Sequence, residues 1–344
     1  MKYRAMTRPA SRDTLLTIER RLSLDFSYIL KKIESAEIAE TPFRHLEING
    51  LFEETDFRKI VDSLEVSTPE AADDESLFDC LFSRGYRVIE FPGCTRNHRD
   101  YINWHTDKKV THETGTSCEG FGVVLRLEHA QSEAIIELQN FVTSAAFIDC
   151  IAAKFDVSPE LCKYDAGIQK YLDGYEISPH PDIRKKALTY MVNINPNPAA
   201  DAEEHHTSYL KFKPAWSYVQ SFWEGNPRQD RCWVPWEWCE IVKQQRRNNS
   251  IVVFSPDNDT LHAVKADYSH LVFQRTQIYG NLWLKRNPAD SRNKPRWEDY
   301  LITKNSGIKA TTRTYLKELK RQFAGKWKTK NDAYPAATHS DRKY

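Results

Sequence analysis

The stretch YEISPHPDIRKKALTYMVNINP, residues 175–196, decides the fold of this chain. His180 and Asp182 stand on either side of Pro181, and a run of strand-forming residues follows at once. Side chains at positions i and i+2 of an extended segment point to the same side, so this imidazole and this carboxylate are able to converge on one ion. The stretch therefore predicts two metal ligands at the mouth of a buried strand.

Short strands separated by turns are predicted on both sides of this stretch. They are KYLDGYEI (170–177), KALTYMVNIN (186–195), SYLKFK (208–213), SYVQSFW (217–223), NSIVVFSP (249–256), TLHAVKA (260–266) and HLVFQRTQIYGNLWL (270–284). Few helical periods interrupt them. Successive short strands with turn signals between them are typical of an antiparallel sandwich or barrel.

The first half of the chain predicts a mixture of helices and strands. Helices are expected at 15–37, 53–64 and 132–155, strands at 45–48, 85–91 and 120–128, and an acidic loop at 67–76. The order lacks the alternation of strand and helix that builds a parallel sheet, which favours an α+β fold. Beyond Pro288 we expect one basic amphipathic helix at 311–323 and then a loose tail.

Composition excludes several classes of protein. The 344 residues carry a formal net charge of +1, which gives no reason to expect a nucleic-acid partner. No window is apolar enough for a membrane helix, and the first residues lack the apolar core of a signal peptide, so we expect a cytoplasmic protein. The seven cysteines are scattered without a CxxC pair, which fits reduced thiols.

A third metal ligand is needed, and His262 is the best candidate. It lies in NSIVVFSPDNDTLHAV, where an apolar strand ends in a polar turn and the chain re-enters on a strand. Two histidines and one carboxylate occupy one face of an octahedron, the arrangement that suits non-haem Fe(II) and oxygen chemistry. A second literal HxD, at 105–107, is followed by no comparable block of strands with a distal histidine and arginine.

Arg275 follows His262 by thirteen residues, in the apolar strand HLVFQRTQIYG. Strict alternation places it on one face with Phe273 and Gln277, while Thr276 points the other way. Burying a guanidinium costs several kcal/mol unless an anion meets it, and its planar fork matches a carboxylate. We therefore expect Arg275 to hold the far carboxylate of a dicarboxylic oxo acid.

The order of His180, Asp182, His262 and Arg275 across a block of short strands resembles the Fe(II)/2-oxoglutarate-dependent dioxygenase superfamily over residues 170–285. Upstream, TPFRHLEINGLFEETDFRKIVDSL is similar to the N-terminal segment of prolyl-hydroxylase-like members. The resemblance, which extends to phytanoyl-hydroxylase-like enzymes, implies an α+β, mainly β fold: a double-stranded β-helix (jelly roll) flanked by N-terminal helices and a C-terminal helix. It also implies Fe(II), 2-oxoglutarate as cosubstrate, and O2.

The resemblance extends to further residues and has one departure. It implies that Tyr171 binds the cosubstrate, whereas Met191 stands where hydroxylase relatives carry a second tyrosine. Halogenating relatives replace the metal-binding carboxylate by glycine or alanine. Because this chain keeps Asp182, the resemblance favours hydroxylation.

On this basis we expect a single oxygenase domain over 1–330. It comprises a support region (1–165), a jelly-roll core (166–287) with a Trp-rich insert (214–239), and a helical extension (288–327), and a flexible tail (328–344) follows. The expected reaction is hydroxylation of an aliphatic C–H of a small polar substrate, such as an amino acid or sugar derivative, with release of succinate and CO2. The alternatives are a non-catalytic jelly-roll binding module and a cupin-type metalloenzyme that does not use 2-oxoglutarate.

Other polar residues are weaker candidates. His205 and His206 are adjacent and so face opposite sides of a strand, and we expect loop residues of which one reaches the substrate. His98 and His105 are expected in a solvated loop or lid, and Asn193 and Asn195 are candidates to line the cavity. The insert is expected to close over the substrate together with residues 92–118. Its arginines and aromatics, among them Arg228, Arg231, Trp223 and Trp233, favour a polar and anionic small molecule.

Overall fold

The computed structural model describes residues 24–90, 94–95, 97–107, 122–227, 229 and 231–286. The helices are α2 (Tyr28–Ser35), α3 (Glu54–Val61), α4 (Asp74–Ser83), α5 (His98–Asp107), α6 (Glu133–Val142), α7 (Ala145–Ala153) and α8 (Tyr218–Gly225). The first strands are β1 (Ile38–Ala39), β2 (His45–Asn49), β3 (Tyr86–Val88) and β4 (Val124–Leu127). The later strands are β5 (Cys162–Tyr171), β6 (Glu176–His180), β7 (Lys186–Asn193), β8 (Thr207–Phe212), β9 (Cys239–Gln245), β10 (Ser250–Phe254), β11 (His262–Lys265) and β12 (Arg275–Leu284).

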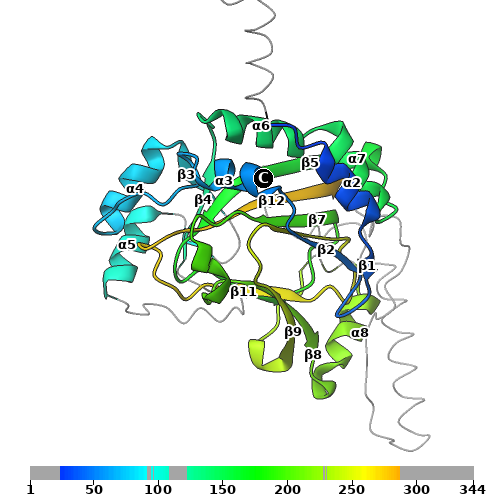
Figure 1. Cartoon of the computed structure of the whole chain (residues 1–344). Coiled ribbons are helices and arrows are strands. Elements are labelled where there is room, and N and C mark those ends of the chain that lie inside the picture. The colour runs from blue at the N-terminus through cyan, green and yellow to red at the C-terminus, as the bar shows by residue number, and fades with distance from the viewer. Residues whose placement is uncertain are drawn as a thin grey trace, which may run out of the picture. The chain divides into compact units, whose positions relative to one another are not determined.

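Two antiparallel sheets form the centre of this structure (Figure 1). The larger sheet has the strand order β1-β2-β10-β7-β12-β5-β4-β3, and the smaller has the order β6-β11-β8-β9. Each sheet takes four of the strands from β5 to β12, and the chain passes back and forth between the two sheets. This is a double-stranded β-helix, and the predicted α+β, mainly β fold is confirmed.

Strand β7 shows why these residues form a central strand. Leu188, Tyr190 and Val192 belong to the apolar core under the helices. Thr189 and Met191 point the other way, into the space between the two sheets. Because successive side chains alternate, a strand covered on both faces needs buried residues at every position.

Strand β12 divides its two faces in the same way. Ile278 and Leu282 pack into the helix-facing core. Arg275, Tyr279 and Asn281 are polar and face the interior between the sheets. Arg275 contacts Thr207 of the smaller sheet, whereas Tyr279 and Asn281 contact Lys186 and Thr189 of the neighbouring strand β7. The interior of the jelly roll is therefore polar at this point, whereas its outer face is apolar.

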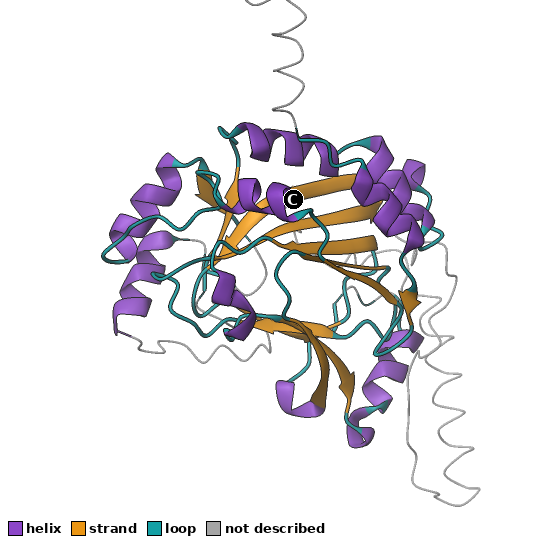
Figure 2. Cartoon of the chain, viewed as in Figure 1, coloured by secondary structure: helices purple, strands orange, loops and turns teal. Residues whose placement is uncertain are grey.

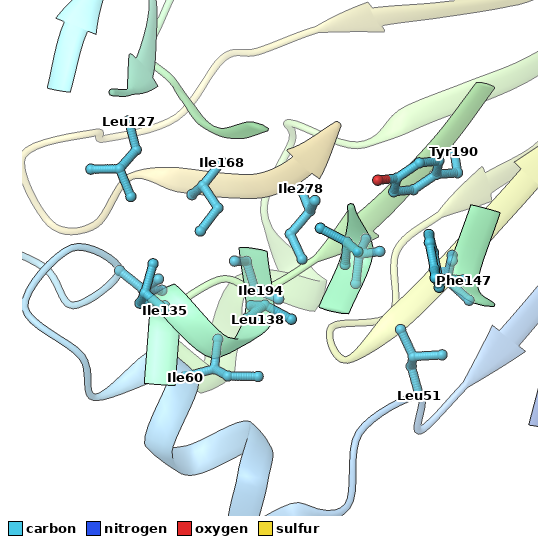
Figure 3. Close-up of a cluster of buried hydrophobic side chains, with 14 of the residues drawn as sticks. Leu51, Ile60, Leu127, Ile135, Leu138, Phe147, Ile168, Tyr190, Ile194 and Ile278 are labelled. Carbon is cyan, nitrogen blue, oxygen red and sulfur yellow. The ribbon is translucent and has the colours of Figure 1, made fainter. Parts of the chain in front are cut away.

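Helices cover the outer face of the larger sheet (Figure 2). Their apolar side chains and those of the sheet form one buried cluster (Figure 3), which includes Ile60 of α3, Ile135 and Leu138 of α6, Phe147 of α7, and Ile168, Tyr190 and Ile278 of the sheet. This packing holds β5, β7 and β12 rigidly, and those strands carry the polar residues on their opposite face. No single described helix is long and apolar enough to span a membrane. Helices α6 and α7 reach that length and apolar composition only when taken together, and they are bent by 47° where they meet.

Two of the predicted elements are wrong. The single helix predicted at 132–155 is two helices. The first ends at Val142 with Thr143 as its C-cap, and Ser144 caps α7 by accepting a hydrogen bond from the Phe147 amide. The strand predicted at 217–223 is helix α8, which places Trp223 in the interior and leaves Phe222 exposed. The aromatic content that suggested a strand serves instead to bury one side of a short helix.

Further differences lie at element boundaries. The strand predicted at 170–177 is interrupted by a turn, in which Gly174 adopts a φ of +75° that favours glycine. Residues 270–274 form a loop, so β12 begins only at Arg275. Helices α4 and α5, strands β1 and β9, and all of β5 before Lys170 were not predicted. The expectations for 15–23 and for 288–344 lie outside the described residues.

Candidate active site

Three side chains of the jelly roll converge at one end of the smaller sheet. His180 ends β6 and His262 begins β11, and the two residues face each other in the strand register. The Nε2 atoms of both histidines lie 3.9 Å from Oδ1 of Asp182. Two ligands that share an ion with bonds of about 2.1 Å are at most about 4.2 Å apart, so the group can hold a metal ion with little movement.

Hydrogen bonds orient both imidazoles toward this point. Nδ1 of His180 lies 2.8 Å from the Ser178 carbonyl, and Nδ1 of His262 lies 2.8 Å from the Thr260 carbonyl. Nδ1 therefore carries the proton, and the Nε2 lone pair faces Asp182. Burial, with His262 beside it, lowers the pKa of His180 to about 3, and burial also lowers the pKa of His262. Both rings are neutral at neutral pH, as metal ligands must be.

Asp182 has partners that the sequence did not suggest. Its Oδ2 accepts a hydrogen bond from the Thr189 hydroxyl at 2.8 Å. Its Oδ1 lies 2.6 Å from Nζ of Lys186, which also donates to the Tyr279 hydroxyl at 2.7 Å. Burial opposes a charge on either group, but the Lys186 ammonium holds the pKa of Asp182 below its ordinary value, and the carboxylate in turn raises the pKa of Lys186. No spacing rule in the sequence marks Lys186 or Thr189, since each is one residue of an ordinary strand.

Arg275 is buried in the same interior, on the neighbouring sheet. Its side chain is 2% exposed, and its guanidinium lies over the ring of Tyr171 at 4.6 Å. Nη2 donates to the Thr207 hydroxyl at 3.1 Å, whereas Nη1 has no hydrogen-bond partner among the described residues. The guanidinium has no carboxylate partner in the described part of the chain. An anion is the group that such an arrangement fits.

Tyr171 lies opposite Arg275 in the register of β5 and β12. Its hydroxyl forms a hydrogen bond of 2.5 Å with the side-chain amide of Gln169. Its ring therefore supports the guanidinium, while its hydroxyl is already engaged. The role of Tyr171 in cosubstrate binding stays a prediction.

The paired histidines His205 and His206 lie in the loop before β8, as predicted, but they are buried. They precede β8 and are 1% and 3% exposed, and His205 packs against the rings of Tyr268 and Phe273. Both ring nitrogens of His205 and Nε2 of His206 lack hydrogen-bond partners among the described residues. Burial, assisted by the nearby Arg275, lowers the pKa of His205 to about 2 and that of His206 to about 4.

These two histidines predict that the folded protein is sensitive to acid. Below their ordinary pKa of 6.5, the unfolded chain binds protons that the folded chain does not. The free energy of unfolding should therefore fall as the pH falls from about 6.5 to about 4, by up to about 1.4 kcal/mol per pH unit for each histidine. Urea unfolding at pH 7.5, 6.0 and 5.0 measures this slope. The His205→Gln/His206→Gln variant should show a shallower slope, and an unchanged slope would assign the effect to other groups.

Asn193 and Asn195 are occupied by hydrogen bonds within the protein. The Asn193 amide donates to the carbonyls of Gln245 and Arg247 and accepts from Gln277. The Asn195 carbonyl oxygen accepts from the Thr276 backbone. Both residues join strands and loops, so their amides are not free to line a cavity.

A second group of ionisable residues, Asp74, His105 and His270, meets the same distance test for a metal site. Its hydrogen bonds distinguish it from the first group. Nδ1 of His105 lies 2.6 Å from one Asp74 oxygen and Nε2 of His270 lies 2.7 Å from the other. Nε2 of His105 lies 3.3 Å from Asp173 on the opposite side of the ring. The group is a hydrogen-bonded connection between α4, α5 and two loops, and His105 is a helix residue that pairs with Asp74.

The Asp74→Asn variant should be destabilised by about 2–4 kcal/mol, because both histidines lose their shared carboxylate in a largely buried site. Its Mn(II) binding should stay at the stoichiometry and affinity of the unchanged protein. Urea unfolding and a metal titration on the same sample measure both quantities. Loss of one bound ion per chain in this variant would instead make the second group a metal site.

The Trp-rich insert (214–239) runs beside the strand that carries His180. The Val234 amide donates to the Pro179 carbonyl at 3.0 Å, and the Trp236 indole donates to Glu176 at 2.6 Å. The guanidinium of Arg184, two residues beyond Asp182, lies 3.6 Å from the ring centre of Trp223. Trp223 is buried by these contacts and is not available to a substrate, whereas Trp233 is partly exposed beneath Arg231. Arg228 lies outside the described residues.

No protein-family model matches the chain, and no curated protein matches its sequence. Solved structures do resemble it. A prolyl hydroxylase from Trichoplax adhaerens, in complex with a hypoxia inducible factor peptide fragment, has a TM-score of 0.39 and 10% identity, with 83% of this chain and 99% of that chain covered. A 2OG-Fe(II) oxygenase family oxidoreductase from Burkholderia pseudomallei has a TM-score of 0.26 and 11% identity, with 64% and 94% covered. The Escherichia coli ribosomal oxygenase YcfD has a TM-score of 0.33 and 8% identity, with 88% and 67% covered.

The strand order and the polar interior define the class of this chain. It is an antiparallel jelly-roll protein whose interior brings together a two-histidine, one-carboxylate group and a buried arginine.

Proposed function

We propose that this protein is an Fe(II)- and 2-oxoglutarate-dependent dioxygenase that hydroxylates an aliphatic C–H bond. The observation that carries the proposal is the pairing of two features in one interior. These are a neutral two-histidine, one-carboxylate group and a buried guanidinium without a carboxylate partner among the described residues. Fe(II) and 2-oxoglutarate supply dioxygen activation when bound, with succinate and CO2 as the products of the oxo acid.

Each residue has a distinct task in this proposal. His180, Asp182 and His262 hold the metal through two neutral nitrogens and one anionic oxygen, which leaves positions open on the metal. Arg275 binds the far carboxylate of 2-oxoglutarate, and Tyr171 supports the guanidinium. The net charge of the three ligands and Fe(II) is about +1, which favours an anionic cosubstrate.

The proposed substrate is a small polar molecule such as an amino acid or a sugar derivative. Its place is beside the insert, where Arg231 and Trp233 offer a cation and an aromatic surface. The insert lies against β6, next to His180 and Asp182, and this position supports the prediction that it closes over the substrate. A cytoplasmic location also remains our proposal.

The test is release of succinate from 2-oxoglutarate in the presence of a panel of amino acids, nucleotides and sugars. We expect succinate release that requires both Fe(II) and O2 and that one class of compound stimulates. The His262→Ala variant is the control for release that does not depend on the site. Equal release by this variant and the unchanged protein would contradict the proposal and favour a non-catalytic binding module.

A peptide or protein substrate is the second candidate. Tyr218 and Phe222 lie one turn apart on α8 and are 59% and 49% exposed, and the rings of Trp216 and Trp238 stack nearby at 4.0 Å. An exposed aromatic surface beside an active site suits a macromolecule better than a small solute. If no small molecule stimulates turnover, peptides become the next panel to test.

A further inference from the structure

The Tyr209 hydroxyl and Nη1 of Arg275 are among the buried polar atoms of the jelly-roll interior that have no hydrogen-bond partner among the described residues. Tyr209 is 0% exposed and Arg275 is 2% exposed. A buried polar group costs free energy when it is left unpaired. Two such donors in one interior indicate that a polar ligand completes them.

Side-chain contacts connect these two residues through Met191 and Thr207. Tyr209 and Met191 belong to the same small apolar cluster, together with Phe43. The Thr207 hydroxyl lies 3.8 Å from the Met191 sulfur and accepts a hydrogen bond from Arg275. Met191 therefore belongs to the cluster that contains Tyr209 and also contacts the Thr207 hydroxyl to which Arg275 donates.

The strand register places Tyr209 between the metal group and Arg275. Tyr209 pairs with His262 across β8 and β11. Thr207 is two residues earlier on β8, so both side chains face the interior. A ligand that reaches from His262 to the guanidinium beside Thr207 passes along this face of β8.

Other tyrosines near Arg275 already use their hydroxyls. Tyr171 bonds to the Gln169 amide, and Tyr268 donates to the Tyr171 carbonyl while accepting from the Arg275 amide. Tyr209 differs from both, because its hydroxyl has no hydrogen-bond partner in the described part of the chain.

We propose that the Tyr209 hydroxyl supplies the cosubstrate contact for which hydroxylase relatives use a tyrosine at the position of Met191. The inference rests on the proposed function. The hydroxyl donates a hydrogen bond to the carboxylate that Arg275 binds, so the donor comes from β8 and not from β7. Met191, which has no donor of its own, fills the space beside the Tyr209 ring. Tyr209 is thus a cosubstrate-binding and specificity residue of this particular chain.

The Tyr209→Phe variant tests the proposal with two opposite effects. In the ligand-free protein, thermal unfolding should occur at the same temperature or higher, because the ring packing stays and an unpaired hydroxyl is removed. In the Mn(II)-loaded protein, calorimetric titration should show binding of 2-oxoglutarate weakened about 10- to 100-fold, as expected for a hydrogen bond to a charged group. The rise in unfolding temperature on adding 2-oxoglutarate should shrink accordingly.

Two further variants, a rescue and a control, test the role of the Tyr209 hydroxyl. Adding Met191→Tyr to Tyr209→Phe should restore part of the affinity, since it places a hydroxyl where relatives have one. Tyr86→Phe is the matched control, because the Tyr86 hydroxyl is buried but donates to the Glu65 carbonyl at 3.0 Å, away from the site. That variant should lose stability and keep its affinity for 2-oxoglutarate.

The outcomes separate the two proposals. Unchanged affinity in Tyr209→Phe, with normal binding by the unchanged protein, overturns the role of Tyr209 and leaves the proposed function standing. A loss of ligand-free stability in Tyr209→Phe like that of the Tyr86 variant makes Tyr209 a structural residue, which also overturns it. Failure of the unchanged protein to bind 2-oxoglutarate overturns the proposed function, and the inference with it.

Discussion

The Asp182→Asn variant is expected to lose at least about 1000-fold in 2-oxoglutarate turnover, since an amide cannot replace the anionic ligand oxygen. It should also unfold more easily. Lys186 is buried beside Asp182, and removing one partner of a buried ion pair costs about 3–5 kcal/mol. Succinate release and urea unfolding measure the two effects separately.

A double variant separates ligation from stability. Asp182→Asn combined with Lys186→Met removes both charges, so most of the lost stability should return. Mn(II) binding, measured by titration, should remain absent in both variants. If the double variant binds Mn(II) as tightly as the unchanged protein, Asp182 is not a metal ligand.

The Arg275→Met variant is expected to weaken 2-oxoglutarate binding by about 100-fold or more, because truncating one partner of a buried charge pair costs about 2–5 kcal/mol. Its stability without ligand should not fall, since methionine fills apolar space and removes a desolvated charge that burial already disfavours. The measurements are a calorimetric titration with 2-oxoglutarate on the Mn(II)-loaded protein and thermal unfolding.

The control for this variant is Arg58→Met, which removes an exposed guanidinium paired with Glu54 on α3. This variant should keep the 2-oxoglutarate affinity and the unfolding temperature of the unchanged protein, because an exposed ion pair contributes little to stability. Full activity in the Arg275→Met variant would contradict the proposed cosubstrate site and support a metalloenzyme of the cupin type, which does not use 2-oxoglutarate.

Local sequence pattern was sufficient to predict most strands of the jelly roll, because the pattern that marks a strand is contained within a few consecutive residues. The run that became β7 and the run that became β10 are apolar or strand-forming at nearly every position, which only a buried strand tolerates. The pattern failed at α8, where clustered aromatics fit either period. It also failed at 132–155, where the first helix ends at Val142 and Ser144 caps a second.

The meeting of His180, Asp182 and His262 followed from the order of motifs together with the expected fold. Their neighbours could not be predicted in this way. Lys186 and Thr189 contact Asp182 because the turn after it brings β7 back past the same point. A lysine at the start of a strand is ordinarily solvated, so its sequence position carries no sign of this role.

The sequence by itself determined the alternating strands, the HxD pair with its distal histidine, and an arginine in an apolar strand, since each depends on spacing along a few residues. Only the tertiary structure decided which polar groups in the interior are paired and which are not. In that structure the Tyr171 hydroxyl bonds to Gln169, the Tyr209 hydroxyl has no partner among the residues that the structure describes, and His105 pairs with Asp74 and Asp173. The physical reason is that hydrogen-bond pairing in a buried interior depends on residues distant in the chain, which meet only when the two sheets close on each other.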